Sequence, residues 1–122
     1  MSQLILIRGL PGSGKSTMAR FKYPNHIHLE SDDYFINSDG DYCFDGSLIK
    51  EAHAWCFNTA KILTRQGHNI VVSNTFTQKW EIQKYLELRV TKRVVVATGS
   101  YGSIHNVPED VIKKMAERWE EF

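Results

Sequence analysis

The stretch LILIRGLPGSGKST, residues 4–17, joins an apolar run to a glycine-rich turn. Residues 4–7 have the pattern of a strand buried on both faces of a parallel sheet. Residues 9–16 then fit the pattern G-x-x-x-x-G-K-[S/T] in the strand–loop–helix setting that it requires. Glycines let backbone amides turn toward an anion, and a helix that begins near Lys15 adds its dipole. We therefore predict a loop that holds a nucleoside triphosphate, the alternative being a glycine turn without a ligand.

Two side chains of this loop have specific expected tasks. Lys15 is placed to reach the outer phosphates, and the Ser16 hydroxyl is placed to ligate Mg2+. Mg2+ keeps most of its water when it bridges phosphate oxygens, so it needs few protein ligands. The residues predicted to bind the nucleotide are Gly9, Pro11, Gly12, Ser13, Gly14, Lys15, Ser16 and Thr17.

Three further short runs resemble the first strand, namely residues 27–30, 70–73 and 94–97. Stretches with helical periodicity separate them. This alternation predicts an α/β fold, in which helices flank a parallel sheet of about four strands in three layers. Because ligands of such sheets bind beyond the carboxyl ends of the strands, we expect the chemistry to follow directly after each run.

The helical segments are identified by apolar residues at three- and four-residue steps. Residues 48–63 form the longest stripe, and Gly67 follows as an expected stop. Residues 78–88 form the next stripe. The last stripe runs from 111 to 122, behind Pro108 as an expected helix start.

Composition sets the limits within which the motifs are interpreted. A chain of 122 residues with 42% hydrophobic and 24% charged residues is expected to form one globular domain, residues 1–122. Its formal charge of +1 excludes the strong basic excess of proteins that hold nucleic acid mainly by neutralising phosphates. Cys43 and Cys56 fit neither a metal site nor a disulfide framework, and no segment is long enough to span a membrane. We expect free thiols and a cytoplasmic location.

Two carboxylates, Asp32 and Asp33, follow the second predicted strand. At the edge that carries a phosphate-binding loop, one carboxylate can accept the proton of an attacking hydroxyl and a second can hold a metal through water. We assign Asp32 to catalysis and to the metal, with Asp33 as its catalytic partner. The alternative is that Asp32 only caps a turn or a helix start.

The third predicted strand ends in Ser73-Asn74-Thr75, without a carboxylate. These side chains can hydrogen-bond a metal-bound water or an acceptor substrate. Alternatively, the Asn-Thr pair only bends the chain out of the sheet. We include Asn74 and Thr75 as candidate substrate contacts.

Other aromatic and titratable residues give weaker signals. Trp55, Trp80 and Trp119 lie in predicted helices, and we expect them and Met115 to pack in the core. Of the five histidines, His105 alone lies in a loop where a site could use it, beyond the fourth strand. A surface histidine without a role is the alternative there.

Four segments together resemble a known family. They are GLPGSGKST at 9–17, SDDYF at 31–35, SNTFTQKWEIQKYL at 73–86 and HNVPEDVIKKMAERWE at 105–120. In this order they resemble the polynucleotide 5′-kinase-like branch of the P-loop kinases, which is related to AAA domains and zeta toxins. The resemblance implies transfer of the γ-phosphate of ATP to a hydroxyl with Mg2+, on a four-stranded parallel sheet with a lid over the nucleotide. It also implies that Asp32 is the general base.

This sequence departs from the family pattern at three places. Phe35 stands where the polynucleotide kinase has an arginine, and Asn74 or Ser73 stands where an aspartate is expected. The lid is short: only residues 98–104 precede the H-x-V-P motif, where family members carry an arginine-bearing insert. Such an arginine contributes about 10³ to 10⁵ in rate. Its candidate substitutes are Lys92, Arg93 and Arg118.

Three functions therefore compete at the sequence level. The first is an ATP-dependent kinase acting on a hydroxyl acceptor, either a nucleic-acid 5′-hydroxyl or a small alcohol. The second is a catalytically weak nucleotide-binding or interaction module, which could engage a partner through the loop of residues 37–47. The third is an NTPase that uses water. The oligomeric state stays open.

Overall fold

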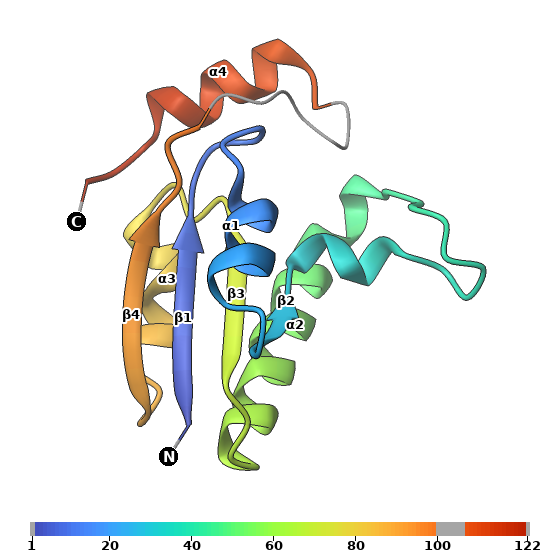
Figure 1. Ribbon diagram of the computed structural model, residues 1–122. Coiled ribbons are helices and arrows are strands. Elements are labelled where there is room, and N and C mark those ends of the chain that lie inside the picture. The colour runs from blue at the N-terminus through green and yellow to red at the C-terminus, as the bar shows by residue number, and fades with distance from the viewer. Residues whose placement is uncertain (1, 100–106, 122) are drawn as a thin grey trace.

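Strand β1 (Gln3–Arg8) lies in the interior of a four-stranded parallel sheet with the order β2-β3-β1-β4 (Figure 1). The computed structural model describes residues 2–99 and 107–121. The other strands are β2 (Ile27–Leu29), β3 (Ile70–Asn74) and β4 (Thr91–Val96). Every pairing is parallel, which confirms the predicted α/β fold. Strand β4 begins at Thr91, three residues before the predicted start, because its pairing with β1 extends down to Gln3.

The apolar run of β1 forms the centre of two hydrophobic clusters. Leu4, Ile5, Leu6 and Ile7 are each 0% exposed, and burying one such side chain contributes about 1.5–3 kcal/mol. Since side chains alternate along a strand, Leu4 and Leu6 pack in one cluster while Ile5 and Ile7 pack in the other. This double burial explains why the run is continuous rather than alternating.

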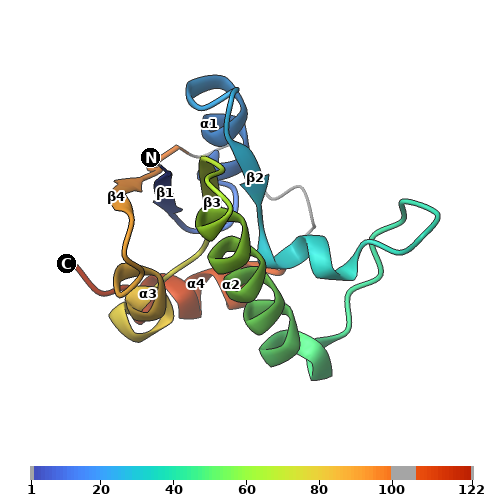
Figure 2. The same cartoon turned by 90° about the horizontal axis from the view of Figure 1, so that it is seen from below.

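The helices are α1 (Lys15–Lys22), α2 (Ile49–Arg65), α3 (Lys79–Leu86) and α4 (Glu109–Glu117), with two short 3-10 helices, η1 (Ser31–Phe35) and η2 (Gly46–Leu48). Figure 2 shows α1 on one face of the sheet and α2 and α3 on the other. The predicted stop of the long helix is confirmed, since α2 ends two residues before Gly67, whose φ is +92°. Helix α4 lies across the carboxyl edge of the sheet (Figure 1).

The predicted extent of the last helix is wrong at its end. Helix α4 stops at Glu117, and Trp119 lies outside it. The Trp119 ring instead covers the guanidinium of Arg8, whose carbon lies 3.9 Å from the ring centre. Arg8 also donates to the Glu120 carbonyl over 2.7 Å. These contacts with the end of β1 draw the chain out of its helical path.

Two expectations of core packing are also wrong. Trp80 lies in α3 but is 72% exposed, because Ile82 and Tyr85 form the buried side of that helix. Met115 does not pack in a core cluster. It lines a cleft at the carboxyl edge of the sheet, because α4 crosses that edge. Trp55 does pack against the core beneath α2.

Candidate active site

The loop between β1 and α1 has a backbone that only glycine adopts readily. Gly12 and Gly14 have φ values of +83° and +88°. At Gly9 the limit is space: a Cβ there would lie 2.3 Å from the Ser13 hydroxyl oxygen and 2.9 Å from the Ala97 carbonyl oxygen. The three glycines of the motif therefore each meet a physical requirement of the turn. The loop leads directly into the first turn of α1, as an anion-binding loop requires.

Lys15 and Ser16 are the first two residues of α1. The Lys15 ammonium donates to the Leu10 carbonyl over 3.1 Å, so the side chain folds back over the loop. Burial lowers the pKa of Lys15, an effect that the nearby charges of Glu30 and Asp32 oppose. An anion bound in the loop would act in the same direction as these carboxylates and stabilise the charged ammonium.

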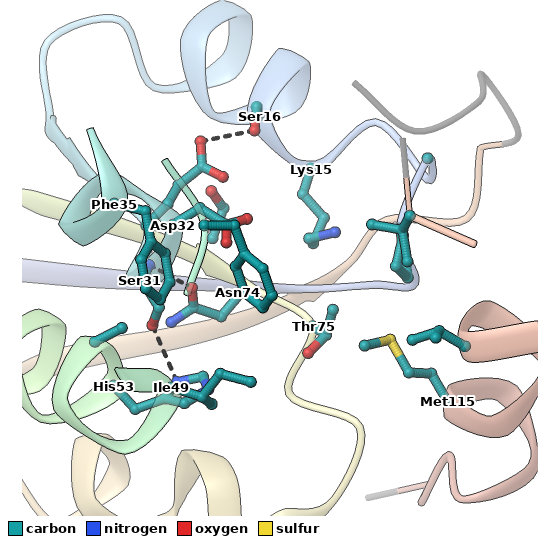
Figure 3. Close-up of a pocket in the computed structure, with 18 of the residues that line it drawn as sticks. Lys15, Ser16, Ser31, Asp32, Phe35, Ile49, His53, Asn74, Thr75 and Met115 are labelled. Carbon is teal, nitrogen blue, oxygen red and sulfur yellow. Dashed lines mark hydrogen bonds between the residues drawn. The ribbon is translucent and has the colours of Figure 1, made fainter. Parts of the chain in front are cut away.

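Glu30 is a member of this site that the sequence interpretation missed. The Ser16 hydroxyl donates to its Oε1 over 2.8 Å (Figure 3). Burial raises the pKa of Glu30, and the hydrogen bond from Ser16 opposes that effect. The signal was present in the sequence, because Glu30 closes the second apolar run at the edge where ligands bind. It follows β2 immediately.

Asp32 and Asp33 lie in η1 but have different surroundings. Asp33 Oδ2 accepts a hydrogen bond from the backbone amide of Glu30 over 3.1 Å, within a capping box. Asp33 therefore takes part with the N-cap residue Glu30 in capping a helix start, the role considered for Asp32. Asp32 lines the cleft, and its Oδ1 accepts from the Tyr42 hydroxyl over 3.3 Å.

The end of β3 contributes Asn74 and Thr75. Asn74 is 7% exposed, and its Oδ1 accepts from the backbone amide of Ser31 over 2.8 Å. Its side-chain oxygen thus fixes η1 to the sheet. Thr75 lines the cleft, while its carbonyl accepts from the Gly9 amide over 3.2 Å. Of the two candidate substrate contacts, Thr75 has its side chain toward the open space in Figure 3.

Histidines reach the site in a way that the sequence did not predict. His53, from α2, lines the cleft, and its Nδ1 lies 3.0 Å from the Ser31 hydroxyl. Burial lowers the pKa of His53. His28, in β2, has its Nε2 2.6 Å from Ser73 Oγ. The expected site histidine, His105, lies outside the described residues.

A cleft of about 760 Å³ is lined by several of these groups, namely Lys15, Ser16, Glu30, Asp32, His53, Asn74 and Thr75. Figure 3 shows Lys15, Asp32, Thr75 and Met115 around the same space. The aromatic residues that line it are Phe35, Tyr42 and Phe44, and the segment that leads into and forms α4 lines it with Val107, Pro108, Val111 and Met115.

One of the three candidate substitutes for the lid arginine reaches the cleft. Arg118 lines it, and its Nε donates to Thr77 Oγ1 over 3.1 Å. Lys92 instead donates to the carbonyls of Leu88 and Val90, before the start of β4. Arg93 lies within β4, opposite Ile5 and away from the carboxyl edge.

The chemistry of the donor set fits Mg2+. Ser16 and Glu30 present a hydroxyl and a carboxylate oxygen side by side, and hard cations of this kind prefer oxygen ligands. Across residues 2–99 and 107–121, no three His, Cys, Asp or Glu side chains converge on a complete protein-built metal site. A cation that keeps its waters and binds phosphate oxygens does not need one.

The remaining expectations concern thiols and membranes. Cys43 and Cys56 are both free, as predicted. In the described part of the chain, no helix combines the length and the apolar character needed to cross a bilayer.

Comparison with known proteins gives three findings. A family model described as an AAA domain matches residues 4–98. NEDD4-binding protein 2 from Homo sapiens is 34% identical over 136 aligned residues, which cover 98% of this chain and 8% of the human protein. The chain thus spans a small part of that relative.

Solved structures share the architecture. A chain of the Pnkp1/Rnl/Hen1 RNA repair complex has a TM-score of 0.71 and 19% identity, covering 97% of this chain and 44% of that chain. A gluconokinase from Sinorhizobium meliloti 1021 has a TM-score of 0.65 and 16% identity, covering 98% of this chain and 75% of that chain. At these identities the likeness shows the fold alone, the α/β architecture of the P-loop NTPases. Because the family model spans most of the sequence, the chain belongs to the AAA domain family.

Proposed function

We propose that the protein is an ATP-dependent kinase that transfers the γ-phosphate of ATP to a hydroxyl acceptor. The observation that carries this proposal is the convergence of Lys15, Ser16 and Asp32 on one cleft at the carboxyl edge of the sheet. The first two are suited to hold a triphosphate, and the third is suited to accept a proton. We also propose that residues 1–122 form a single domain that contains this site.

In this proposal the loop binds the phosphates. The backbone amides of Gly12 and of residues 14–17, together with the positive end of the α1 dipole, attract the anion. Lys15 moves from the Leu10 carbonyl to a phosphate oxygen, so that a charged hydrogen bond replaces a weaker one. Ser16 would hold Mg2+, with Asp32 acting through water. When bound, this ion neutralises charge on the phosphate oxygens.

Asp32 then serves as the base in the transfer step. The acceptor oxygen forms a bond with the γ-phosphorus while the bond from that phosphorus to the bridging oxygen breaks. ADP leaves, and the acceptor proton passes to the Asp32 carboxylate. Asp33 supports this arrangement by capping η1, and Arg118, one of the cations that line the cleft, is available to the transferred group.

The acceptor class is inferred from resemblance. A polynucleotide 5′-kinase-like identity favours a 5′-hydroxyl nucleic acid. The likeness in fold to a gluconokinase supports a small alcohol as the acceptor equally well. Phe35 and the formal charge of +1 argue against strong phosphate recognition on the acceptor side.

A labelling experiment tests the proposal. The protein is incubated with γ-labelled ATP and Mg2+, with a 5′-hydroxyl oligonucleotide or gluconate as acceptor, or with none. Label should appear on an acceptor, and Asp32→Asn should remove transfer while ATP affinity stays unchanged. Lys15→Ala should weaken ATP binding itself. Asp39→Asn, in an exposed loop, serves as the matched control.

Two outcomes contradict the kinase assignment. Label that appears only as free phosphate, independent of acceptor, identifies a water-using NTPase. Tight ATP binding without any labelled product identifies a nucleotide-binding module. An active Asp32→Asn variant would overturn the role of Asp32 alone.

A further inference from the structure

Glu30 occupies a position in the site that the proposed function leaves without a task. Its Oε1 lies 2.8 Å from the Ser16 hydroxyl, the group that would face the cation. A carboxylate this close to the Ser16 hydroxyl lies within reach of any ion that the hydroxyl binds. The positive charge of Lys15 acts on this carboxylate as well and favours its ionised form.

The end of β3 carries Ser73, Asn74 and Thr75, and none of them is the carboxylate that was expected there. Ser73 Oγ is held 2.6 Å from His28 Nε2, and Asn74 Oδ1 accepts from the Ser31 amide. Both polar side chains are less than one-tenth exposed and are engaged in structural hydrogen bonds. The carboxylate next to Ser16 therefore comes from the neighbouring strand, β2.

The orientation of Glu30 is fixed from three directions. Its backbone amide donates to Asp33 Oδ2, which anchors the residue at the start of η1. The His28 ring lies 3.5 Å from Oε1, the same oxygen that Ser16 contacts. The parallel register of His28 with Val71 fixes that ring against β3. The Glu30 side chain is 19% exposed, so it has little freedom to turn away.

We propose that Glu30 and Ser16 together hold the divalent cation that accompanies the nucleotide, so that β2 supplies the carboxylate that is missing after β3. The inference rests on the proposed function, and it assigns separate tasks to two carboxylates. Glu30 faces the phosphate loop and contacts the cation directly, whereas Asp32 faces the acceptor and acts on the cation only through water. His28 is then a positioning residue, because it acts on the cation only through Glu30.

The test measures cation binding without relying on turnover. The probes are Mn2+, followed by the loss of its free electron paramagnetic resonance signal, and a fluorescent ADP analogue, titrated with Mn2+ and with EDTA. Glu30→Gln should bind the analogue in EDTA as well as the natural protein does, which also shows that it is folded. It should bind Mn2+ in the ADP complex at least about tenfold more weakly. Glu87→Gln is the control, because Glu87 follows the last residue of α3 and does not line the cleft. This variant should bind Mn2+ and the analogue as tightly as the natural protein does.

Two further variants sharpen the result. Ser16→Ala should lose the same Mn2+-dependent part of the affinity for the ADP analogue. Adding Glu30→Gln to Ser16→Ala should weaken Mn2+ binding little further, since the two groups act on one ion. Glu30→Asp keeps the charge on a shorter side chain and should retain part of the Mn2+ affinity. Mn2+ affinity of Glu30→Gln equal to that of the natural protein overturns the inference and leaves the kinase proposal standing. If the natural protein binds no ADP analogue in either condition, the proposed function fails, and the inference fails with it.

Discussion

The Tyr42 hydroxyl donates a hydrogen bond to Oδ1 of Asp32 over 3.3 Å, and so joins the candidate base to a residue of the following loop. A backbone bridge between Ile36 and Tyr42 holds the loop in this position. Burial, together with the negative charge of Asp32, raises the pKa of Tyr42 to about 12, so the phenol stays a donor at neutral pH. The aromatic loop thereby helps to orient the carboxylate.

Tyr42→Phe should slow phosphoryl transfer without weakening ATP binding. A hydrogen bond of this kind contributes about 0.5–1.5 kcal/mol, so the turnover number should fall about two- to tenfold. The measurement is the rate of labelled product at saturating ATP, alongside the dissociation constant of ATP. Tyr34→Phe, on the 3-10 helix η1 that carries Asp32, is the control. Equal rates for both variants would remove Tyr42 from the positioning of Asp32.

Gly9→Ala should destabilise the fold and the loop together. The new Cβ would meet the Ser13 hydroxyl at 2.3 Å and the Ala97 carbonyl at 2.9 Å, and that backbone oxygen has little room to move. Such overpacking costs about 1–3 kcal/mol, which lowers the melting temperature by several degrees, roughly 2–15 °C. Thermal unfolding followed by circular dichroism measures it.

Gly46→Ala is the matched control for that change. A Cβ at Gly46 would lie 3.7 Å from the Phe44 ring, which is an ordinary contact. The melting temperature should therefore stay within about 2 °C of the natural value. If the two alanine variants melt alike, the crowding at Gly9 does not decide stability.

Arg8→Lys should weaken the attachment of Trp119 and Glu120, which follow α4, to the end of β1. The guanidinium is 1% exposed and donates to carbonyls of both Phe76 and Glu120, while its face lies against Trp119. A lysine has no planar fork and cannot serve these partners at once. We expect a loss of about 2 kcal/mol or more in the free energy of unfolding, measured with urea.

The same variant has a local signature. The Glu120 amide donates to the Thr77 carbonyl over 2.7 Å, and its hydrogen exchange should accelerate when Arg8 no longer holds the segment. Arg65→Lys, at the exposed end of α2, should change neither quantity. Unchanged exchange at Glu120 in Arg8→Lys would show that Trp119 and Thr77 hold the segment without Arg8.

His28 should make stability depend on pH near neutrality. Burial lowers its pKa in the folded state from the ordinary 6.5, so the unfolded chain binds the proton more tightly. The stabilisation that neutral His28 gives to the folded state is complete above about pH 6.5. It is lost as the pH falls through that value toward the lower pKa of the folded state. The free energy of unfolding in urea at pH 7.5 and 5.5 should therefore fall more in the natural protein than in His28→Gln. An equal fall in both would assign the acid sensitivity to other groups.

The sequence predicted the parts of the fold that depend on local patterns. Each of the four predicted apolar runs overlaps a strand of three to six residues, and the glycine spacing places the phosphate loop directly after β1. These features are readable because strand burial and left-handed glycines leave a short-range signal. The convergence of Lys15, Ser16 and Asp32 on one edge follows from the parallel topology that the alternation implied.

The tertiary structure decided which polar group faces which. Nothing local distinguishes Asp32, open to the cleft, from Asp33, which caps η1. Glu30 reaches Ser16 only because β2 lies beside β3 at the sheet edge, in a register set by long-range pairing. Helix periodicity alone gave Trp119 a helical place, whereas the Arg8 guanidinium draws it onto the end of β1. A sequence pattern records the burial and the turn preference of each residue, but a partner distant in the chain is chosen by packing.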